Sequence, residues 1–147
     1  MIRKIVPEDF LECCTMMDEF YHTDGVLAPI PMEQIQKNVR AALEGSPYSE
    51  LYLFVCDDQP AGYGQISLTY SGEAGGLCVL LEEIYVRPEF QGRGIGTKYL
   101  EFVKQEYRDR AARFRLEACP SNQKAIRLYE KMGFETLPYL QMIMDQK

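Results

Sequence analysis

The feature that most constrains the fold is the segment CVLLEEIYV at residues 78–86. Apolar residues occupy both alternating sets of positions, which is typical of a strand covered on both faces and not of one with a solvent-exposed face. The segment therefore predicts a central strand in a sheet with helices packed on both sides. It also places two adjacent carboxylates, Glu82 and Glu83, inside this otherwise apolar strand.

Further elements are expected on both sides of this strand. Before it, the pattern predicts strands at 2–6, 51–57 and 62–70, helices at 7–21 and 31–45, and a Gly/Pro-containing loop at 22–31. The stretch DQPAG between the strands at 51–57 and 62–70 is a turn signal and predicts an antiparallel hairpin.

After the central strand, apolar residues at steps of four from Ile95 predict a helix, and 114–118 predicts a strand. Ser121 is expected to cap a helix that runs to Met132, and a short strand pair should use 134–145. The order β-α-α-β-β-β-α-β-α-β-β predicts a single α/β domain over 1–147. Its mixed, mostly antiparallel sheet should have six to seven strands and about four flanking helices.

The sequence QGRGIG at residues 91–96 stands between the central strand and the next helix. A residue without Cβ lets a backbone amide approach a ligand closely, and a helix start adds the positive end of the helix dipole. The loop therefore predicts an anion site suited to phosphate. A glycine-rich turn that only lets the helix pack tightly is the structural alternative.

Two better-known phosphate loops are excluded by spacing. A Walker loop needs Gly-Lys-Ser/Thr, but Thr97 precedes Lys98 here. The dinucleotide fingerprint GxGxxG would need a glycine at position 97 or 99, where Thr97 and Tyr99 stand.

Two blocks of the chain resemble the GNAT superfamily of acyl-CoA-dependent N-acetyltransferases. LEEIYVRPEFQGRGIGTKYLEFV is similar to motif A, Q/R-x-x-G-x-G/A, which is matched by Gln91, Gly94 and Gly96. NQKAIRLYEKMGF at 122–134 is similar to motif B, matched by Asn122, Ala125, Leu128, Tyr129, Gly133 and Phe134. The resemblance covers roughly residues 50 to 135 and implies a GNAT-like fold, while the first 45 residues fit only by pattern.

The resemblance implies acetyl-CoA as the cofactor. Its pyrophosphate is expected on the amides of the motif A loop, formed by Gln91, Gly92, Arg93, Gly94, Ile95, Gly96 and Thr97. The strand before the loop should part from its neighbour at a β-bulge, so that backbone groups of Ile84, Tyr85 and Val86 can pair with pantetheine. An N–H near Val86 can then face the thioester. Arg93 could add positive charge or be solvated. Asn122 could bind the cofactor arm or serve the helix cap.

A protonated amine acceptor requires a base, and Glu82 and Glu83 are the candidates. Strand alternation would place Glu82 with Leu80, Ile84 and Val86, and Glu83 with Val79, Leu81 and Tyr85, where apolar surroundings raise a carboxyl pKa. Similarity to family members that acetylate polyamines favours Glu82; ion pairing is the alternative for either glutamate. The resemblance also implies that Tyr129 is the acid that protonates the leaving thiolate. The alternative is a structural role for Tyr129 at the edge of the core.

The acceptor site has weaker candidates. Tyr21, His22, Asp24 and Glu83 are possible acceptor-binding residues, together with LPYLQM at 137–142. Cys119 could suggest an acyl-cysteine intermediate, but no basic partner lies near it in the sequence, which favours direct transfer in a ternary complex.

The composition narrows the partners and the compartment. A net charge of −6 argues against nonspecific binding of nucleic acid or anionic lipid and is compatible with a cationic acceptor or with solubility alone. Five cysteines without metal-type spacing predict reduced, mostly buried thiols and no metal site. The N-terminus lacks a secretory pattern and no apolar run could span a bilayer, so we expect a cytoplasmic protein.

Three function classes are compatible with these patterns. The first is an N-acetyltransferase that moves an acetyl group from acetyl-CoA to a primary amine of a small molecule or a peptide. The second is a non-catalytic acyl-CoA sensor or partner module, against which Glu82 and Tyr129 argue. The third, a nucleotide-binding protein, is disfavoured by the failed fingerprints. A homodimer is compatible with the fold and is not decided by the sequence.

Overall fold

The computed structural model describes residues 1–146, which form one mixed sheet between two pairs of helices. The strands are β1 (Ile2–Lys4), β2 (Ser49–Cys56), β3 (Gln59–Ser71), β4 (Gly76–Val86) and β5 (Ala111–Leu116). The helices are α1 (Phe10–Phe20), α2 (Met32–Leu43), α3 (Ile95–Glu106) and α4 (Gln123–Lys131), with short 3-10 turns η1 (Pro7–Asp9) and η2 (Pro88–Phe90). The predicted fold class and the order of the elements through α4 are confirmed.

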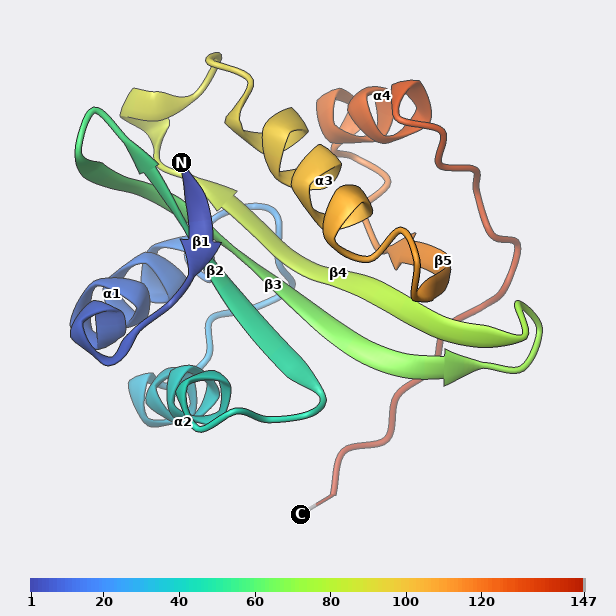
Figure 1. Cartoon of the computed structure of the whole chain (residues 1–147), viewed down its shortest axis with the longest axis horizontal. Helices are drawn as coiled ribbons and strands as arrows, with labels where there is room; N and C mark the ends of the chain where they lie inside the picture. The colour runs from blue at the N-terminus through green and yellow to red at the C-terminus, as the bar shows by residue number, and fades with distance from the viewer. Residues whose placement is uncertain (147) are drawn as a thin grey trace.

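The sheet has the order β1-β2-β3-β4-β5 (Figure 1). All neighbouring strands are antiparallel except β4 and β5, which are parallel because α3 crosses over between them. The predicted β2–β3 hairpin is present, but its turn lies at Asp57 and Asp58 and not over DQPAG. Both aspartates have left-handed φ angles of 53° and 58°, a turn whose twist matches that of the flanking strands, and Pro60 lies within β3.

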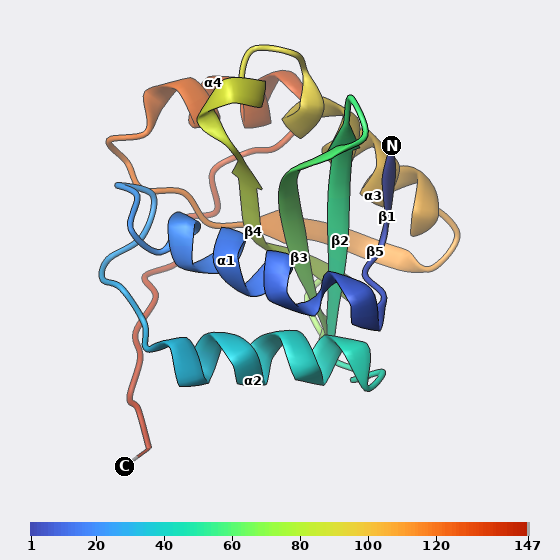
Figure 2. The same ribbon diagram turned by 90° about the vertical axis from the view of Figure 1, so that its left-hand side faces the viewer.

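The three expected layers are present. α1 and α2 cover one face of the sheet, and α3 and α4 cover the other (Figure 2). Each face has its own apolar cluster. The α1/α2 cluster centres on Met16, Met17, Ile35, Val39, Leu53 and Tyr63, and the α3/α4 cluster centres on Phe54, Ile66, Val79, Tyr99, Leu100 and Val103.

Gly64 of β3 lets α3 lie close to the sheet. A Cβ at this position would lie 2.2 Å from Cζ of the fully buried Tyr99 ring. A Cβ atom cannot lie this close to another carbon atom. The absence of a side chain at Gly64 therefore allows α3, and the glycine loop at its start, to pack at their observed distance from the sheet.

Two predictions about the C-terminal part are wrong. The strand pair expected at 134–145 is not formed, and residues 134–146 contain neither helix nor strand, so the sheet has five strands. The N-cap of α4 is Asn122 and not Ser121, because the Asn122 Oδ1 atom accepts a hydrogen bond from the Ala125 amide at 3.3 Å. Asparagine caps a helix as well as serine does, and sequence alone did not choose between adjacent cap residues.

The cysteines are free thiols. Cys13, Cys14 and Cys78 are buried, as expected, while Cys56 and Cys119 are half-buried. Burial raises the pKa of Cys13 to about 12. Among the described residues, none of the helices has the length and apolar character required to cross a membrane.

Candidate active site

The glycine loop has the backbone geometry of an anion site. Gly92 and Gly94 have φ angles of +80° and +76°, which other residues rarely adopt, and Gly94 is the N-cap of α3. The first helical bond runs from the Lys98 amide to the Gly94 carbonyl, so the amides of residues 95–97 have no acceptor inside the helix. A Cβ at Gly92, Gly94 or Gly96 would meet nothing within 4 Å, which leaves the loop open to a ligand.

Two polar side chains of this loop are engaged by the protein. Nη1 of Arg93 lies 2.8 Å from Oδ2 of Asp57 in the β2–β3 turn, and its guanidinium stacks on Phe90 at 5.2 Å from the ring centroid. The Gln91 side chain donates to the Val86 carbonyl at 3.0 Å. The Arg93 charge therefore lies at the rim of the loop, paired with an exposed carboxylate and not directed over the amides.

β4 parts from β5 just before the loop. Pairing with β5 ends at Leu81 opposite Leu116, whereas pairing with β3 continues to Val86 opposite Gly62. Residues 82–86 therefore keep one neighbouring strand and lose the other. The gap lies where it was predicted, at Ile84, Tyr85 and Val86. Backbone groups here that face away from β3 can receive an extended ligand as an added strand, although the Val86 carbonyl already accepts a hydrogen bond from the Gln91 side chain.

The predicted alternation of side chains along β4 is wrong around Glu82. Gln65 pairs with Glu83 while Ile66 pairs with Leu81, so Glu82 is the extra residue of a β-bulge. As a result Leu81 and Ile84, three positions apart, both contact the α3/α4 cluster. Glu83 lies with Tyr63 on the opposite face, not with Val79 and Leu81.

The two carboxylates therefore have different surroundings. Glu82 is exposed and accepts a hydrogen bond from the Ser67 hydroxyl at 2.9 Å. Glu83 is only 8% exposed and accepts hydrogen bonds from the hydroxyls of Tyr21 at 2.5 Å and Tyr63 at 2.7 Å. Burial raises the pKa of Glu83 above its usual value, and the two tyrosine hydrogen bonds act in the opposite direction.

A cavity of about 100 Å³ opens where the strands part. It brings together four residues that the sequence analysis selected, namely Glu82, Ile84, Asn122 and Tyr129. Burial raises the pKa of Tyr129, so its hydroxyl stays protonated at neutral pH. The charged residues of the lining are both acidic, Glu82 and Glu117, which favours a cationic occupant.

Other lining residues were not predicted as a site. Phe20 and Gly25 come from the end of α1 and the following loop, and Glu117 and Ala118 come from the end of β5. The position of Glu117 and Ala118 could have been predicted from the sequence, because the carboxyl ends of neighbouring parallel strands meet at one edge of a sheet. Cys119 also lines the cavity, with Sγ 3.8 Å from the Gly25 carbonyl, and no Lys, Arg or His is in the lining.

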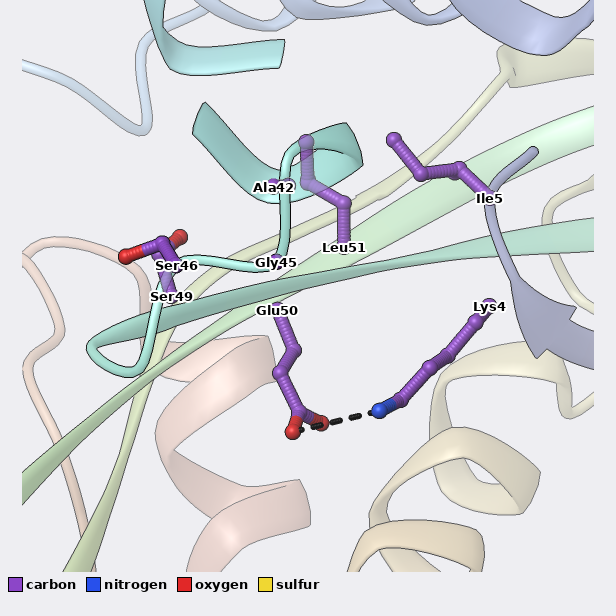
Figure 3. Close-up of a pocket in the computed structure, with 8 residues that line it drawn as sticks. All are labelled: Lys4, Ile5, Ala42, Gly45, Ser46, Ser49, Glu50 and Leu51. Carbon is purple, nitrogen blue, oxygen red and sulfur yellow. Dashed lines mark ion pairs between the residues drawn. The ribbon is translucent and has the colours of Figure 1, made fainter. Parts of the chain in front are cut away.

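The remaining acceptor candidates lie outside this cavity. Tyr21 is held by Glu83, and the His22 Nδ1 atom lies 2.8 Å from the Asp18 carbonyl at the end of α1. Asp24 is exposed. The larger cavity of about 210 Å³ lies at the other end of the sheet, between the end of α2 and the start of β2 (Figure 3). Its charged residues, Lys4 and Glu50, pair with each other at 3.3 Å, and no predicted site residue lines it.

The glycine loop, the gap between β4 and β5 and the cavity beside it form one continuous candidate site, and comparison with known proteins gives the family of the chain. The profile of the acetyltransferase (GNAT) family matches residues 13–134, most of the chain. The chain therefore belongs to the GNAT family of acetyltransferases, whose acyl donor is acetyl-CoA.

Particular relatives show how far the likeness extends. Pig thialysine N-epsilon-acetyltransferase is 39% identical over 77 residues, which are 52% of this chain and 45% of the relative, so the chain spans about half of that protein's length. The crystal structure of a probable acetyltransferase superposes with a TM-score of 0.83 at 24% identity, covering 99% of each chain. Aminoglycoside N-acetyltransferase AAC(6')-Iy in complex with CoA superposes with a TM-score of 0.81 at 15% identity, covering 100% of this chain and 95% of that one.

The residues present fit acetyl-CoA. Two left-handed glycines and three amides without helical acceptors offer a diphosphate seat with open space above it. The unpaired edge of β4 continues from this seat to the cavity that contains Glu82 and Tyr129. One extended ligand can thus reach from the loop to the two side chains.

Proposed function

We propose that this protein transfers the acetyl group of acetyl-CoA to the primary amine of a small cationic acceptor, by direct attack in a ternary complex. The observation that carries the proposal is the position of Glu82 and Tyr129 in one acidic cavity, at the point where β4 leaves β5. The pig relative acts on thialysine, and AAC(6')-Iy acts on aminoglycosides; both names describe acceptors that carry amines.

The main chain holds the cofactor in this proposal. The amides from Gln91 to Thr97, with Gly92, Gly94 and Gly96 among them, receive the pyrophosphate, and Ile84, Tyr85 and Val86 pair with the pantetheine arm. Arg93 adds its charge once it leaves Asp57. Asn122 holds the start of α4 through its cap bond and thereby positions Tyr129 two turns further on.

Glu82 is the proposed base. It accepts a proton from the acceptor ammonium, directly or through a water molecule, so that the neutral amine can attack the thioester carbonyl. Its exposure suits this role, because a carboxylate that exchanges protons with solvent can be regenerated after each turnover. Glu83 has both oxygens occupied by tyrosine hydroxyls and is the less suitable base; it holds Tyr21 beside the loop that carries Gly25.

Tyr129 is the proposed acid. As the carbon–nitrogen bond forms and the carbon–sulfur bond breaks, its hydroxyl donates a proton to the departing thiolate. The second proton that the nitrogen loses on becoming an amide returns to the tyrosine oxygen, directly or through a water molecule. A backbone N–H near Val86 stabilises the negative charge on the carbonyl oxygen, a contribution commonly worth about 10² to 10³ in rate.

The alternative is a non-catalytic acyl-CoA module of the same fold. Calorimetry with acetyl-CoA and release of thiol in the presence of an amine panel separate the two, because a sensor binds the cofactor and releases no thiol with any amine. The panel should contain diamines, lysine analogues, aminoglycosides and peptide α-amines, and we expect the multiply charged amines to react best. A cytoplasmic location remains a prediction.

The catalytic assignments are tested by two variants, and the change at Glu82 has a matched control at Glu117. Tyr129→Phe should lower kcat by roughly 100-fold or more with little change in acetyl-CoA affinity. Glu82→Gln should lower kcat/KM by roughly 100-fold or more, while Glu117→Gln, which removes the other charge of the cavity, should have a much smaller effect. An unchanged kcat for Tyr129→Phe would remove the tyrosine as acid, and an unchanged kcat/KM for Glu82→Gln would transfer the role of base to Glu83 or to solvent.

A further inference from the structure

Arg87 follows directly after the end of β4, and two glutamates of α1 hold its side chain. Its Nη1 atom lies 2.7 Å from Oε1 of Glu12. Its Nε and Nη2 atoms donate to the two carboxylate oxygens of Glu19 at 3.1 and 3.0 Å. A guanidinium that bonds both oxygens of one carboxylate has a fixed orientation, and the Arg87 side chain is only 17% exposed. These contacts fix the end of β4 against α1.

Two further contacts complete this Arg87 network. Nη1 of Arg87 also donates to the Pro60 carbonyl of β3 at 3.2 Å, and the Tyr85 hydroxyl donates to Glu19 at 3.0 Å. Burial disfavours the charged form of Glu19, but the hydrogen bonds from Arg87 and Tyr85 lower its pKa below the usual value. The carboxylate is therefore ionised at neutral pH, and the network joins α1, β3 and β4 through charged hydrogen bonds.

Val86 lies between the two residues of β4 that this network holds. The Arg87 amide donates to the Ala61 carbonyl at 2.8 Å, and Gly62 lies opposite Val86. Antiparallel neighbours alternate between pairs that share hydrogen bonds and pairs that share none. Because Arg87 belongs to a bonded pair, Val86 belongs to a pair without hydrogen bonds. The N–H and the carbonyl of Val86 therefore point away from β3, into the gap between β4 and β5.

The direction of the Val86 N–H depends on this last bond between β4 and β3. Beyond Leu81, β4 is no longer paired with β5, so one neighbouring strand holds its final residues. The ends of a strand pair open more readily than its centre. The contacts of the Arg87 side chain keep residue 87 beside Ala61 and oppose this opening.

The same network connects the two parts of the candidate site. Glu19 is followed by Phe20, which lines the acidic cavity from the end of α1. Arg87 is preceded by Val86, which faces the gap that can receive an extended ligand. The bond between Glu19 and Arg87 thus sets the position of the cavity wall relative to the end of β4.

We propose that Arg87 is a positioning residue for acyl transfer, which holds the Val86 N–H in the direction of the thioester carbonyl oxygen. The inference rests on the proposed function. A donor aimed at the place where negative charge develops acts mainly in the transition state and adds little to cofactor binding. The diphosphate seat at 92–97 lies outside the network. Loss of the Arg87 side chain should therefore lower kcat and leave the affinity for CoA nearly unchanged.

Arg87→Gln tests this with the amine that the wild type acetylates fastest. We expect kcat to fall about tenfold or more, which is part of the effect of removing such a donor, while the Kd for CoA in calorimetry stays within about threefold. Arg87→Lys keeps the charge but loses the paired contact with Glu19, so its kcat should lie between those of Arg87→Gln and the wild type. Hydrogen exchange without ligand is a second measurement, in which the amide at position 87 should exchange about tenfold faster in Arg87→Gln.

Arg3→Gln is the matched control. Arg3 also bonds both oxygens of one carboxylate, Asp9, at 2.7 and 3.1 Å, but it lies in β1, the edge strand farthest from β5. The variant loses the same kind of ion pair and should keep the wild-type kcat and the wild-type exchange rate at position 87. Glu19 is 35% exposed, so water can solvate it in Arg87→Gln, and circular dichroism establishes that both variants are folded.

Three results would overturn the inference while the wild type is active. The first is a kcat for Arg87→Gln equal to that of Arg3→Gln. The second is a parallel loss of kcat and CoA affinity, because the side chain would then support the whole site and not one N–H. The third is an unchanged exchange rate at position 87. A wild type that releases no thiol with any amine would instead overturn the proposed function, and the inference with it.

Discussion

Replacement of Gly94 by alanine tests the central physical claim, that a left-handed backbone at the start of α3 aims its amides at a diphosphate. Gly94 has φ +76° and ψ 16°, and a Cβ there would meet no atom within 4 Å. The penalty therefore comes from backbone conformation alone. For an L-residue in this region it is roughly 1 to 2 kcal/mol.

Gly96→Ala is the matched control. It adds the same methyl group in equally open space two residues further on, but inside α3, where alanine is favoured over glycine by about 0.5 to 1 kcal/mol. The two single variants should thus differ by roughly 2 kcal/mol in unfolding free energy. For a domain of about this size the difference corresponds to a gap in Tm of roughly 4 to 8 °C.

Circular dichroism is the suitable probe of unfolding, because the chain contains no tryptophan. Calorimetry with CoA supplies the functional measurement. If Gly94→Ala relaxes by turning the loop, the amides no longer converge, and we expect CoA to bind at least about tenfold more weakly, while Gly96→Ala binds within about twofold of wild type. Equal Tm values and equal CoA affinities for the two variants would refute the reasoning.

Two further predictions concern ion pairs. Asp57→Asn should free Arg93 for the phosphates and tighten CoA binding by roughly two- to fivefold at low salt, as measured by calorimetry. Asp58→Asn makes the same charge change at the other left-handed residue of the turn and should not tighten binding. Equal effects of the two variants would exclude a transfer of Arg93 from Asp57 to the phosphates. A hydrogen bond from Arg3 at 2.7 Å lowers the pKa of Asp9 in the folded protein. A carboxylate of this kind stabilises the fold fully at pH values above its unfolded-state pKa. That contribution is lost as the pH falls through the lower, folded-state pKa. Asp9→Asn should therefore cost roughly 0.5 to 1 kcal/mol at neutral pH, and the gap to wild type in urea unfolding should close in acid; a gap independent of pH would contradict the assignment.

Much of the fold followed from local patterns. The apolar strand at 78–86 required cover on both faces, and α1/α2 and α3/α4 provide it. The glycines after it predicted an open loop that leads into a helix, and the structure has this loop, with positive φ angles at Gly92 and Gly94. These features depend on residues that are neighbours in the chain, so they could be predicted from a single sequence.

The predictions that failed depended on partners distant in the sequence. A one-residue bulge opposite Gln65 and Ile66 separated Glu82 from Glu83, exposing the first and burying the second between Tyr21 and Tyr63. Strand alternation alone has no information about a bulge, because the extra residue is defined only by the register of the neighbouring strand. The pairing of Arg93 with Asp57 was equally invisible, since it depends on how the β2–β3 turn lies against the glycine loop.

The amino-acid sequence by itself determined the family, and it predicted the glycine loop as the cofactor seat and Asn122 and Tyr129 as the two residues of the second motif. Tertiary structure alone decided which carboxylate faces the cavity and which basic residue is already paired. It also decided that residues 134–146 add no strand to the second edge of β5. The physical reason is the distance along the chain between the residues that interact. Backbone conformation and helix starts are set by residues adjacent in the chain. Burial, strand register and charge pairing are set by residues that only folding brings together.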